Sequence, residues 1–211
     1  MTKIYKSDEG ARAVRERYLE MLKRWPAPNE QMRVPTRQGE TFIIACGEKA
    51  ARPLLLFHGS ASNSAMWMGD VRAWAEHYRV YSIDLIGEAG LSAPARPPLA
   101  SEEYALWLDN VLKALSVTHA SIVGVSLGGW LALDYNTRQP ERVTSIALAV
   151  LGGKDVLLDS AATKRRLERN VPQADIRYLP EAGHFIPRQT SAILDFLDQS
   201  TGRPDPAKLL T

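Results

Sequence analysis

The stretch Ala120-Ser121-Ile122-Val123-Gly124-Val125-Ser126-Leu127-Gly128-Gly129 decides how this chain is expected to fold. A short apolar run leads into Gly124-Val125-Ser126-Leu127-Gly128, and a helical pattern over 127–138 follows it. This order predicts a buried strand, a sharp turn that carries Ser126, and a helix. Glycines two positions before and after the serine leave room in the turn, where larger side chains would collide. The hydroxyl is then expected to project from the sheet above a helix start, where N–H groups favour developing negative charge.

Apolar runs of this kind alternate with helical patterns along the rest of the chain. Strands that are apolar along their whole length and alternate with helices predict a mostly parallel α/β sheet with helices on both faces. An antiparallel hairpin is predicted before them, because two strand-like runs are joined by Arg37-Gln38-Gly39. The predicted helices cover 8–25, 67–76, 101–115, 127–138, 160–170 and 186–199, and the predicted strands cover 31–36, 40–46, 53–57, 79–84, 120–125, 143–150 and 175–179.

Composition and charge exclude several classes of protein. The chain has 211 residues, of which 45% are hydrophobic and 24% charged, with a net charge of +2, values typical of a globular domain. The densest basic cluster, Lys164-Arg165-Arg166 with Arg169, is interpreted as a solvated helix face, so nucleic acid is not an expected partner. The single cysteine, Cys46, permits no internal disulfide, and the N-terminus lacks the apolar core of a signal peptide. No apolar run reaches the length of a membrane span, so we expect a cytoplasmic protein.

A serine nucleophile needs a base, and His184 is the expected one. It lies in Gly183-His184-Phe185, directly after the last predicted strand, whereas His77 and His119 are expected to be structural or to face solvent. The base in turn needs a carboxylate that fixes its tautomer. Asp155 follows an apolar strand and gives the chain order Ser126, Asp155, His184, which suits this kind of fold. Asp159, four residues further on, is the alternative acid.

Acyl transfer also requires N–H donors for the oxyanion that develops on the substrate. The backbone N–H of Leu127, directly after the nucleophile, is expected to be one donor. The second is expected to be the N–H of Ser60, in a loop of small and polar residues that lets the backbone approach a substrate. His58 is then predicted to be structural, with its imidazole bonded to nearby backbone.

Together these residues resemble the alpha/beta-hydrolase superfamily, and most closely its serine carboxylesterase and lipase-like members. The resemblance runs from about residue 30 to 200 and implies an eight-stranded sheet of the alpha/beta-hydrolase fold, a Ser-His-Asp triad, and hydrolysis without a cofactor or metal. It also implies a structural role for Asp84. The motifs that carry it are His58-Gly59-Ser60, Asp84-x-x-Gly87-x-x-Gly90-x-Ser92, Gly124-Val125-Ser126-Leu127-Gly128-Gly129, Gly152-Gly153-Lys154-Asp155 and Gly183-His184-Phe185.

The sequence departs from this family where a lid is normally inserted. The run 143–150 leads straight into Asp155, although two neighbouring parallel strands need a crossover of a dozen or more residues. The start of this run resembles one strand of the family and its end resembles the next, joined near Leu148–Val150. We therefore expect the lid to be missing near 148–151, either deleted from the protein or present but left out as disordered. The expected domains are an N-terminal helix packed on the core (1–28), the hydrolase core (29–200) and a C-terminal tail (201–211).

Without a lid, nearby apolar side chains become candidates for a substrate pocket. These candidates are Met66, Trp67 and Trp130, and the alternative for the tryptophans is ordinary core packing. The predicted function is hydrolysis of a small-molecule carboxylic ester through an acyl-enzyme. Two alternatives stay open: the same triad acting on carbon–carbon bonds, lactones or amides, or a non-catalytic hydrolase-fold binding protein.

Overall fold

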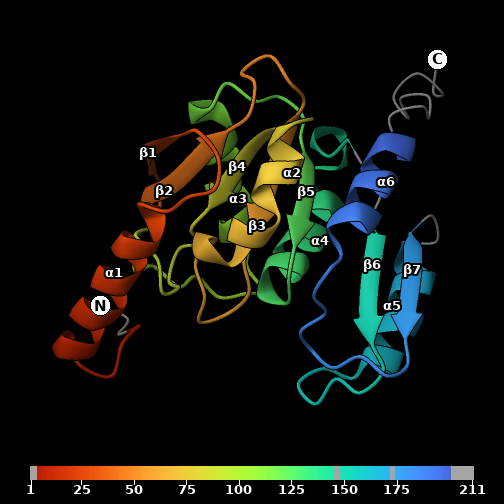
Figure 1. Ribbon diagram of the computed structural model, residues 1–211. Helices are drawn as coiled ribbons and strands as arrows, with labels where there is room; N and C mark the ends of the chain where they lie inside the picture. Colours follow the sequence, from red (N-terminus) through yellow and green to blue (C-terminus); the bar gives the residue numbers. More distant parts are fainter. Residues whose placement is uncertain (1–3, 145–147, 172–173, 201–211) are drawn as a thin grey trace. The chain divides into compact units, whose positions relative to one another are not determined.

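The computed structural model describes residues 4–144, 148–171 and 174–200, so the predicted tail at 201–211 lies outside the described residues. The chain divides into two compact units, Met1–Thr144 and Ser145–Thr211. In the first unit, five strands form one sheet in the order β1-β2-β4-β3-β5 (Figure 1). Their bounds are β1 Asn29–Thr36, β2 Gly39–Cys46, β3 Pro53–Phe57, β4 Arg79–Ile83 and β5 Ser121–Gly124.

This sheet is mixed, which corrects the prediction of a mostly parallel sheet. β3 pairs in parallel with β4 and β5, but β2 pairs antiparallel with both β1 and β4. The reason is the length of the connections. Only six residues, 47–52, separate β2 from β3, and such a short segment reverses the chain, whereas a parallel pair needs a long crossover. The hairpin at the edge of the sheet is confirmed, with Thr36 paired to Gly39.

Both faces of this sheet are buried, because consecutive residues of its central strands are apolar and their side chains point to opposite faces. Leu55 and Phe57 belong to one cluster together with Trp107 of α3 (Glu103–Ala114) and Leu131 of α4 (Leu127–Arg138). Their neighbours Leu54 and Leu56 point to the opposite face and are also fully buried. The second face is the side of α2 (Val71–Ala75), which follows the short 3-10 helix η1 (Ser64–Gly69). The predicted helix over 67–76 is therefore two shorter helices.

The N-terminal helix α1 (Asp8–Leu22) is tied to this unit by a buried tyrosine. The Ser7 hydroxyl caps its first turn by accepting the Gly10 N–H at 3.0 Å. Tyr18, which is 2% exposed, donates its hydroxyl proton to Asp84 Oδ1 at 2.8 Å. Burial and the Asp84 carboxylate both raise the pKa of Tyr18 above its ordinary value, so the hydroxyl keeps its proton as a donor.

In the second unit, two parallel strands and two helices follow one another. These elements are β6 (Leu148–Gly152), α5 (Ser160–Asn170), β7 (Asp175–Leu179) and α6 (Thr190–Ser200). Helix α6 begins later than the predicted 186, because Arg188 has a left-handed φ of 64° that interrupts a right-handed helix. The described residues thus contain seven strands in sheets of five and two, instead of the eight strands in one sheet that the family resemblance implies.

The run 143–150 is two segments, as the resemblance of its start and its end to two successive strands of the family implies. Val143 forms a parallel bridge with Ala120, at the edge of the first sheet, whereas Leu148 starts β6 and pairs with Asp175. Residues 145–147 lie outside the described residues. In the sequence, only residues 145–147 lie between the two segments. That a lid is missing at this position stays a prediction.

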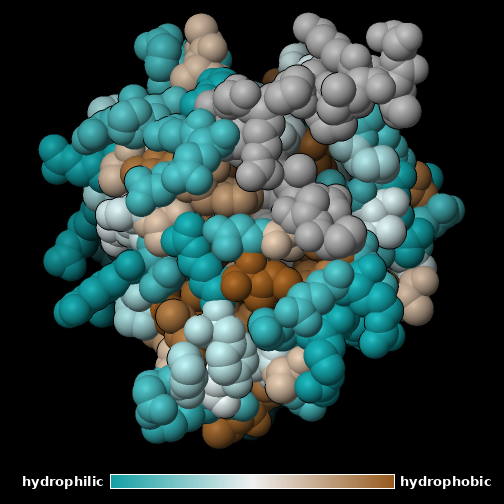
Figure 2. Space-filling view, turned by 90° about the vertical axis from the view of Figure 1, so that its right-hand side faces the viewer, coloured by the Kyte–Doolittle hydropathy of each residue, from teal (hydrophilic) through white to brown (hydrophobic). Residues whose placement is uncertain are grey.

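The second unit exposes several large apolar side chains. Val156 is 92% exposed and Leu157 70%, in the segment that follows β6, and Phe185, beyond β7, is 68% exposed. Figure 2 shows apolar patches among hydrophilic residues on the face that it presents. Exposed apolar side chains are typical of a binding surface where they form a contiguous patch.

We expect Tyr18→Phe to lower the free energy of unfolding by about 1.5–3 kcal/mol, the usual range for a hydrogen bond to a charged group. The reason is that Asp84 stays buried and loses one of its donors. Urea unfolding of the two proteins measures this difference. Leu19→Ala on the same helix is the control, since Leu19 is 42% exposed. A change below about 0.5 kcal/mol for Tyr18→Phe would contradict the expectation.

Candidate active site

Ser126 occupies a strained turn between β5 and α4. Its backbone has φ 53° and ψ −114°, a conformation that residues other than glycine rarely adopt and that costs about 1–3 kcal/mol. Glycines make the turn possible. A Cβ on Gly124 would lie 2.4 Å from the Gly128 carbonyl, and a Cβ on Gly128 would lie 2.2 Å from the Phe57 carbonyl oxygen. The sharp strand–turn–helix geometry predicted from the sequence is therefore confirmed.

The loop after β3 lies directly beside this turn. A Cβ built on Gly59 would be 3.6 Å from Ser126 Cβ and 3.5 Å from the Val125 carbonyl oxygen, both ordinary contact distances. Val125 N–H also donates to the Phe57 carbonyl at 3.1 Å. Ser60 follows Gly59 in this loop, and Leu127 is the first residue of α4, directly after Ser126. That their N–H groups bind an oxyanion stays a prediction.

His58 is fixed by the backbone in one tautomer. The Leu85 N–H can only donate, and it donates to His58 Nε2 at 2.9 Å, so that nitrogen is unprotonated. Nδ1 then carries the proton and donates to the Gly59 carbonyl at 2.8 Å. Burial lowers the pKa of the His58 imidazole, which agrees with this neutral form. The predicted role of His58 in shaping the loop is confirmed by these two bonds.

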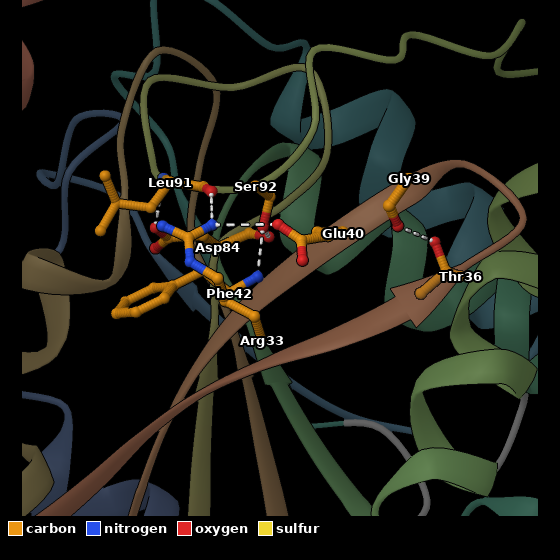
Figure 3. A network of polar contacts seen from close by, with 8 residues as sticks. All are labelled: Arg33, Thr36, Gly39, Glu40, Phe42, Asp84, Leu91 and Ser92. Atoms are coloured by element: carbon orange, nitrogen blue, oxygen red, sulfur yellow. Dashed lines mark hydrogen bonds and ion pairs between the residues drawn. The ribbon is translucent and has the colours of Figure 1, made fainter.

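Asp84 joins the segment after β4 to the elements around it. Its Oδ1 accepts the Ser64 N–H at 2.9 Å and the Ser64 hydroxyl at 2.6 Å, and its Oδ2 accepts the Leu91 N–H at 2.8 Å. Figure 3 shows Asp84 beside the hairpin, where Arg33 Nη1 donates to the Leu91 carbonyl at 2.9 Å. Asp84 therefore fixes the start of η1 and the segment 84–92 against each other, a structural role.

His184 and Asp155 form a pair in the second unit. β6 and β7 are parallel, so the segments that follow them leave the same edge of their sheet. The segments also touch, since the Lys154 N–H donates to the Ala182 carbonyl at 2.8 Å. His184 Nδ1 lies 2.8 Å from Asp155 Oδ2. Because an ionised carboxylate only accepts, Nδ1 carries the proton and Nε2 is left as a base.

The surroundings of Asp155 keep it ionised. Burial alone would raise the pKa of this carboxyl, but the hydrogen bond from His184 and the N–H groups of Leu157 and Leu158 outweigh it and lower the pKa below its ordinary value of 3.8. The alternative acid, Asp159, instead caps α5 by accepting the Ala162 N–H at 2.8 Å. Of the two candidate acids, Asp155 is the partner of His184.

The pocket candidates differ in exposure. Trp67 is 4% exposed and packs against Trp74 with ring centroids 5.7 Å apart, as the core-packing alternative predicts. Trp130 is 40% exposed and Met66 is half-buried, so both stay candidates.

Two features of the site were not predicted from the sequence. One is the exposed apolar segment directly after Asp155, and the other is the contact of Glu88 with the loop after β3. The apolar residues 156–158, directly after the motif that ends at Asp155, could have indicated the exposed apolar segment.

Ser126 lies in the first unit and the His184–Asp155 pair in the second, so a complete triad stays a prediction. A strained serine between a parallel strand and a helix, beside a loop that begins His58-Gly59, nevertheless defines the class of hydrolase-like α/β proteins. A sequence model described as the alpha/beta hydrolase fold matches residues 52–179. The chain belongs to this family.

Relatives within the family include esterases. The chain is 37% identical over 142 residues to the "uncharacterized carboxylesterase nap" of Bacillus subtilis, covering 67% of this chain and 47% of that protein. It is 38% identical over 126 residues to carboxylesterase YbfK of the same organism, covering 60% and 43%. The chain thus matches a little under half the length of these curated relatives. Among the helices of the described residues, none combines the length and apolarity that a bilayer span requires.

Solved structures agree with this assignment. The crystal structure of naproxen esterase from B. subtilis superposes with a TM-score of 0.62 at 31% identity, covering 78% of this chain and 57% of that one. The crystal structure of carboxylesterase CesB (YbfK) from the same organism gives a TM-score of 0.81 at 22% identity, covering 90% and 98%. At 22% identity, the similarity to carboxylesterase CesB shows the fold alone.

We expect Gly128→Ala to destabilise the protein by about 3 kcal/mol or more, at the upper end of overpacking costs, because the new Cβ would collide with a backbone carbonyl that cannot move aside. Gly69→Ala is the matched control, since its Cβ meets nothing within 4 Å. Urea unfolding compares the two variants. Equal stabilities would contradict the crowding described at the turn.

The Asp155 carboxyl should stabilise the fold in a pH-dependent way. Because its pKa is lowered on folding, the contribution is complete above 3.8 and is lost as the pH falls through the depressed value. The stability difference between wild type and Asp155→Asn should therefore shrink as the pH is lowered below about 4. Urea unfolding across this range measures it. A difference that grows on acidification would refute the assignment.

Proposed function

We propose that this chain carries the catalytic machinery of a carboxylesterase, with Ser126 as nucleophile, His184 as base and Asp155 as the residue that orients it. Ser126 Oγ attacks the ester carbonyl while His184 Nε2 takes its proton. The N–H groups of Ser60 and Leu127 bind the oxyanion, and His184 returns the proton to the leaving alkoxide. Water, activated by the same imidazole, then releases the acid and restores the serine hydroxyl.

The observation that carries this proposal is the strained backbone of Ser126, at φ 53°, held beside the Gly59 loop. Strain of this kind persists where the surroundings enforce it, and it is typical of active sites. The His184–Asp155 pair adds an imidazole whose proton is fixed on Nδ1. The relatives named carboxylesterases favour an ester over other acyl compounds.

We further propose that the ester is a small molecule with an apolar portion. Val156 and Leu157 directly follow Asp155 and are strongly exposed, and Phe185 directly follows His184. Apolar side chains at this position would contact a substrate close to the reacting bond. A cytoplasmic location, predicted from the sequence, stays a prediction.

Ser126→Ala and His184→Ala should abolish turnover of p-nitrophenyl esters and labelling by a fluorophosphonate probe. The serine variant lacks the nucleophile and the histidine variant lacks the base that activates it, and removing either costs about 10⁶-fold in a serine hydrolase. A spectrophotometric assay of the full chain with acetate, butyrate and octanoate esters measures the loss.

Ser191→Ala is the matched control, since Ser191 is an exposed residue of α6, and it should retain full activity. Unchanged turnover in Ser126→Ala would overturn the proposal. Turnover of lactones or amides with no turnover of esters would assign the site to a different bond. A wild-type chain that neither labels nor turns over any of these compounds would favour a non-catalytic binding protein.

A further inference from the structure

Ala61 has an unusual backbone conformation at the point where the oxyanion hole is proposed. Its φ is 54°, a left-handed value that is strained for alanine because the Cβ approaches the following carbonyl. Strained residues persist only where neighbouring groups hold them. Ala61 directly follows Ser60, whose N–H is the proposed oxyanion donor, so whatever holds Ala61 also orients Ser60.

The group that holds Ala61 is the carboxylate of Glu88. The Ala61 N–H donates to Glu88 Oε2 at 2.6 Å, a short bond to a charged acceptor. Asn63 strengthens the connection between the same two segments, since its Nδ2 donates to the Ala89 carbonyl at 2.9 Å. The loop after β3 is thus fastened to the segment after β4 on both sides of residue 62.

Glu88 is itself fixed in place. It is 9% exposed, and its other oxygen, Oε1, lies 3.5 Å from Arg96 Nη2. Arg96 also donates through Nε to the Gly87 carbonyl at 2.6 Å. The guanidinium therefore offsets a negative charge that would otherwise oppose an oxyanion close by. The Glu88 backbone is held as well, because its carbonyl accepts the Gly90 N–H at 2.8 Å.

Ser60 lies between two fixed points. On one side, Gly59 packs against Ser126 and Val125, and its carbonyl accepts the His58 Nδ1 proton. On the other side, the Ala61 N–H is held by Glu88. The Gly59 carbonyl belongs to the same peptide group as the Ser60 N–H, and the Ala61 N–H belongs to the next one. Hydrogen bonds to both peptide groups leave the Ser60 N–H little freedom, which is the preorganisation that oxyanion stabilisation requires.

We propose that Glu88 is a positioning residue for the oxyanion hole, acting through Ala61 to orient the Ser60 N–H. This inference rests on the proposed ester hydrolysis. Glu88 touches no reacting atom, and its effect comes from accepting one backbone hydrogen bond. The negative charge is not required for that effect, because an amide carbonyl in the same place accepts the same proton.

The test compares three substitutions in the full chain. Glu88→Met keeps the length of the side chain but removes the acceptor, Glu88→Ala removes the side chain, and Glu88→Gln keeps a carbonyl oxygen. Glu76→Ala, an exposed residue at the end of α2, is the control. We expect Glu88→Met and Glu88→Ala to lower kcat about 10- to 100-fold, less than the loss of a whole donor, while KM stays within about twofold. Glu88→Gln should stay within about fivefold of wild type, since it keeps the acceptor.

A second readout separates positioning from general stability. An arylboronic acid forms a tetrahedral anionic adduct on the serine, so its inhibition constant should weaken in Glu88→Met in parallel with kcat. Circular dichroism and thermal unfolding establish that each variant is folded, and a merely structural role would lower Tm without changing kcat or boronate affinity at 25 °C.

Three outcomes would overturn the inference while leaving the proposed function intact. They are unchanged kcat and boronate affinity in a folded Glu88→Met, equal losses in Glu88→Gln and Glu88→Met, or failure of both Glu88→Met and Glu88→Ala to fold. A wild-type chain that hydrolyses no ester and does not react with a fluorophosphonate would overturn the proposed function, and this inference with it.

Discussion

The first unit depends on one buried carboxylate, that of Asp84. It has no access to solvent, and burying an ionised group is costly unless donors surround it. Tyr18, Ser64 and Leu91 supply these donors from a helix, from a 3-10 helix and from the segment after β4. Each of these elements must be in place for the carboxylate to be tolerated, so the same interaction that stabilises the fold also specifies how its parts meet.

One glycine beside this carboxylate extends the constraint to the segment after β4. A Cβ on Gly90 would lie 2.4 Å from Asp84 Oδ2, so only glycine allows the segment to approach so closely. Ser92 in turn donates to the Asp84 carbonyl and accepts the Phe42 N–H, which joins the segment to β2. Gly90 and Ser92 recur in the sequence motif at a fixed distance from Asp84 because both contact that one residue.

Elements that are set by local pattern could be predicted from the sequence. The helices 127–138 and 160–170 and the strand 175–179 begin and end as predicted, because their apolar periodicity and flanking residues act locally. The partner of β2 could not be predicted, since pairing depends on which strands meet across the sheet rather than on the pattern of either. The split of 143–150 into two segments was predicted from the family resemblance, whereas the apolar pattern alone indicates one continuous strand.

The candidate site was predictable where a motif has a steric cause. The strained turn at Ser126 follows from glycines that nothing larger can replace, and the pairing of His184 with Asp155 follows from two parallel strands that end at one edge. Glu88 could not be found in this way, because its contact with Ala61 joins residues 27 positions apart, and the motifs beside them do not indicate which side chain holds the loop.

The two bonds of His58 have a consequence for how this family member responds to its medium. A second proton on that ring would have to displace the Leu85 N–H, which would separate the ends of two adjacent strands. The two hydrogen bonds therefore favour the neutral ring, which holds the segments after β3 and β4 at a fixed distance. An effect of pH near Ser126 therefore has to come from titratable side chains that are not hydrogen-bonded to the backbone in this way.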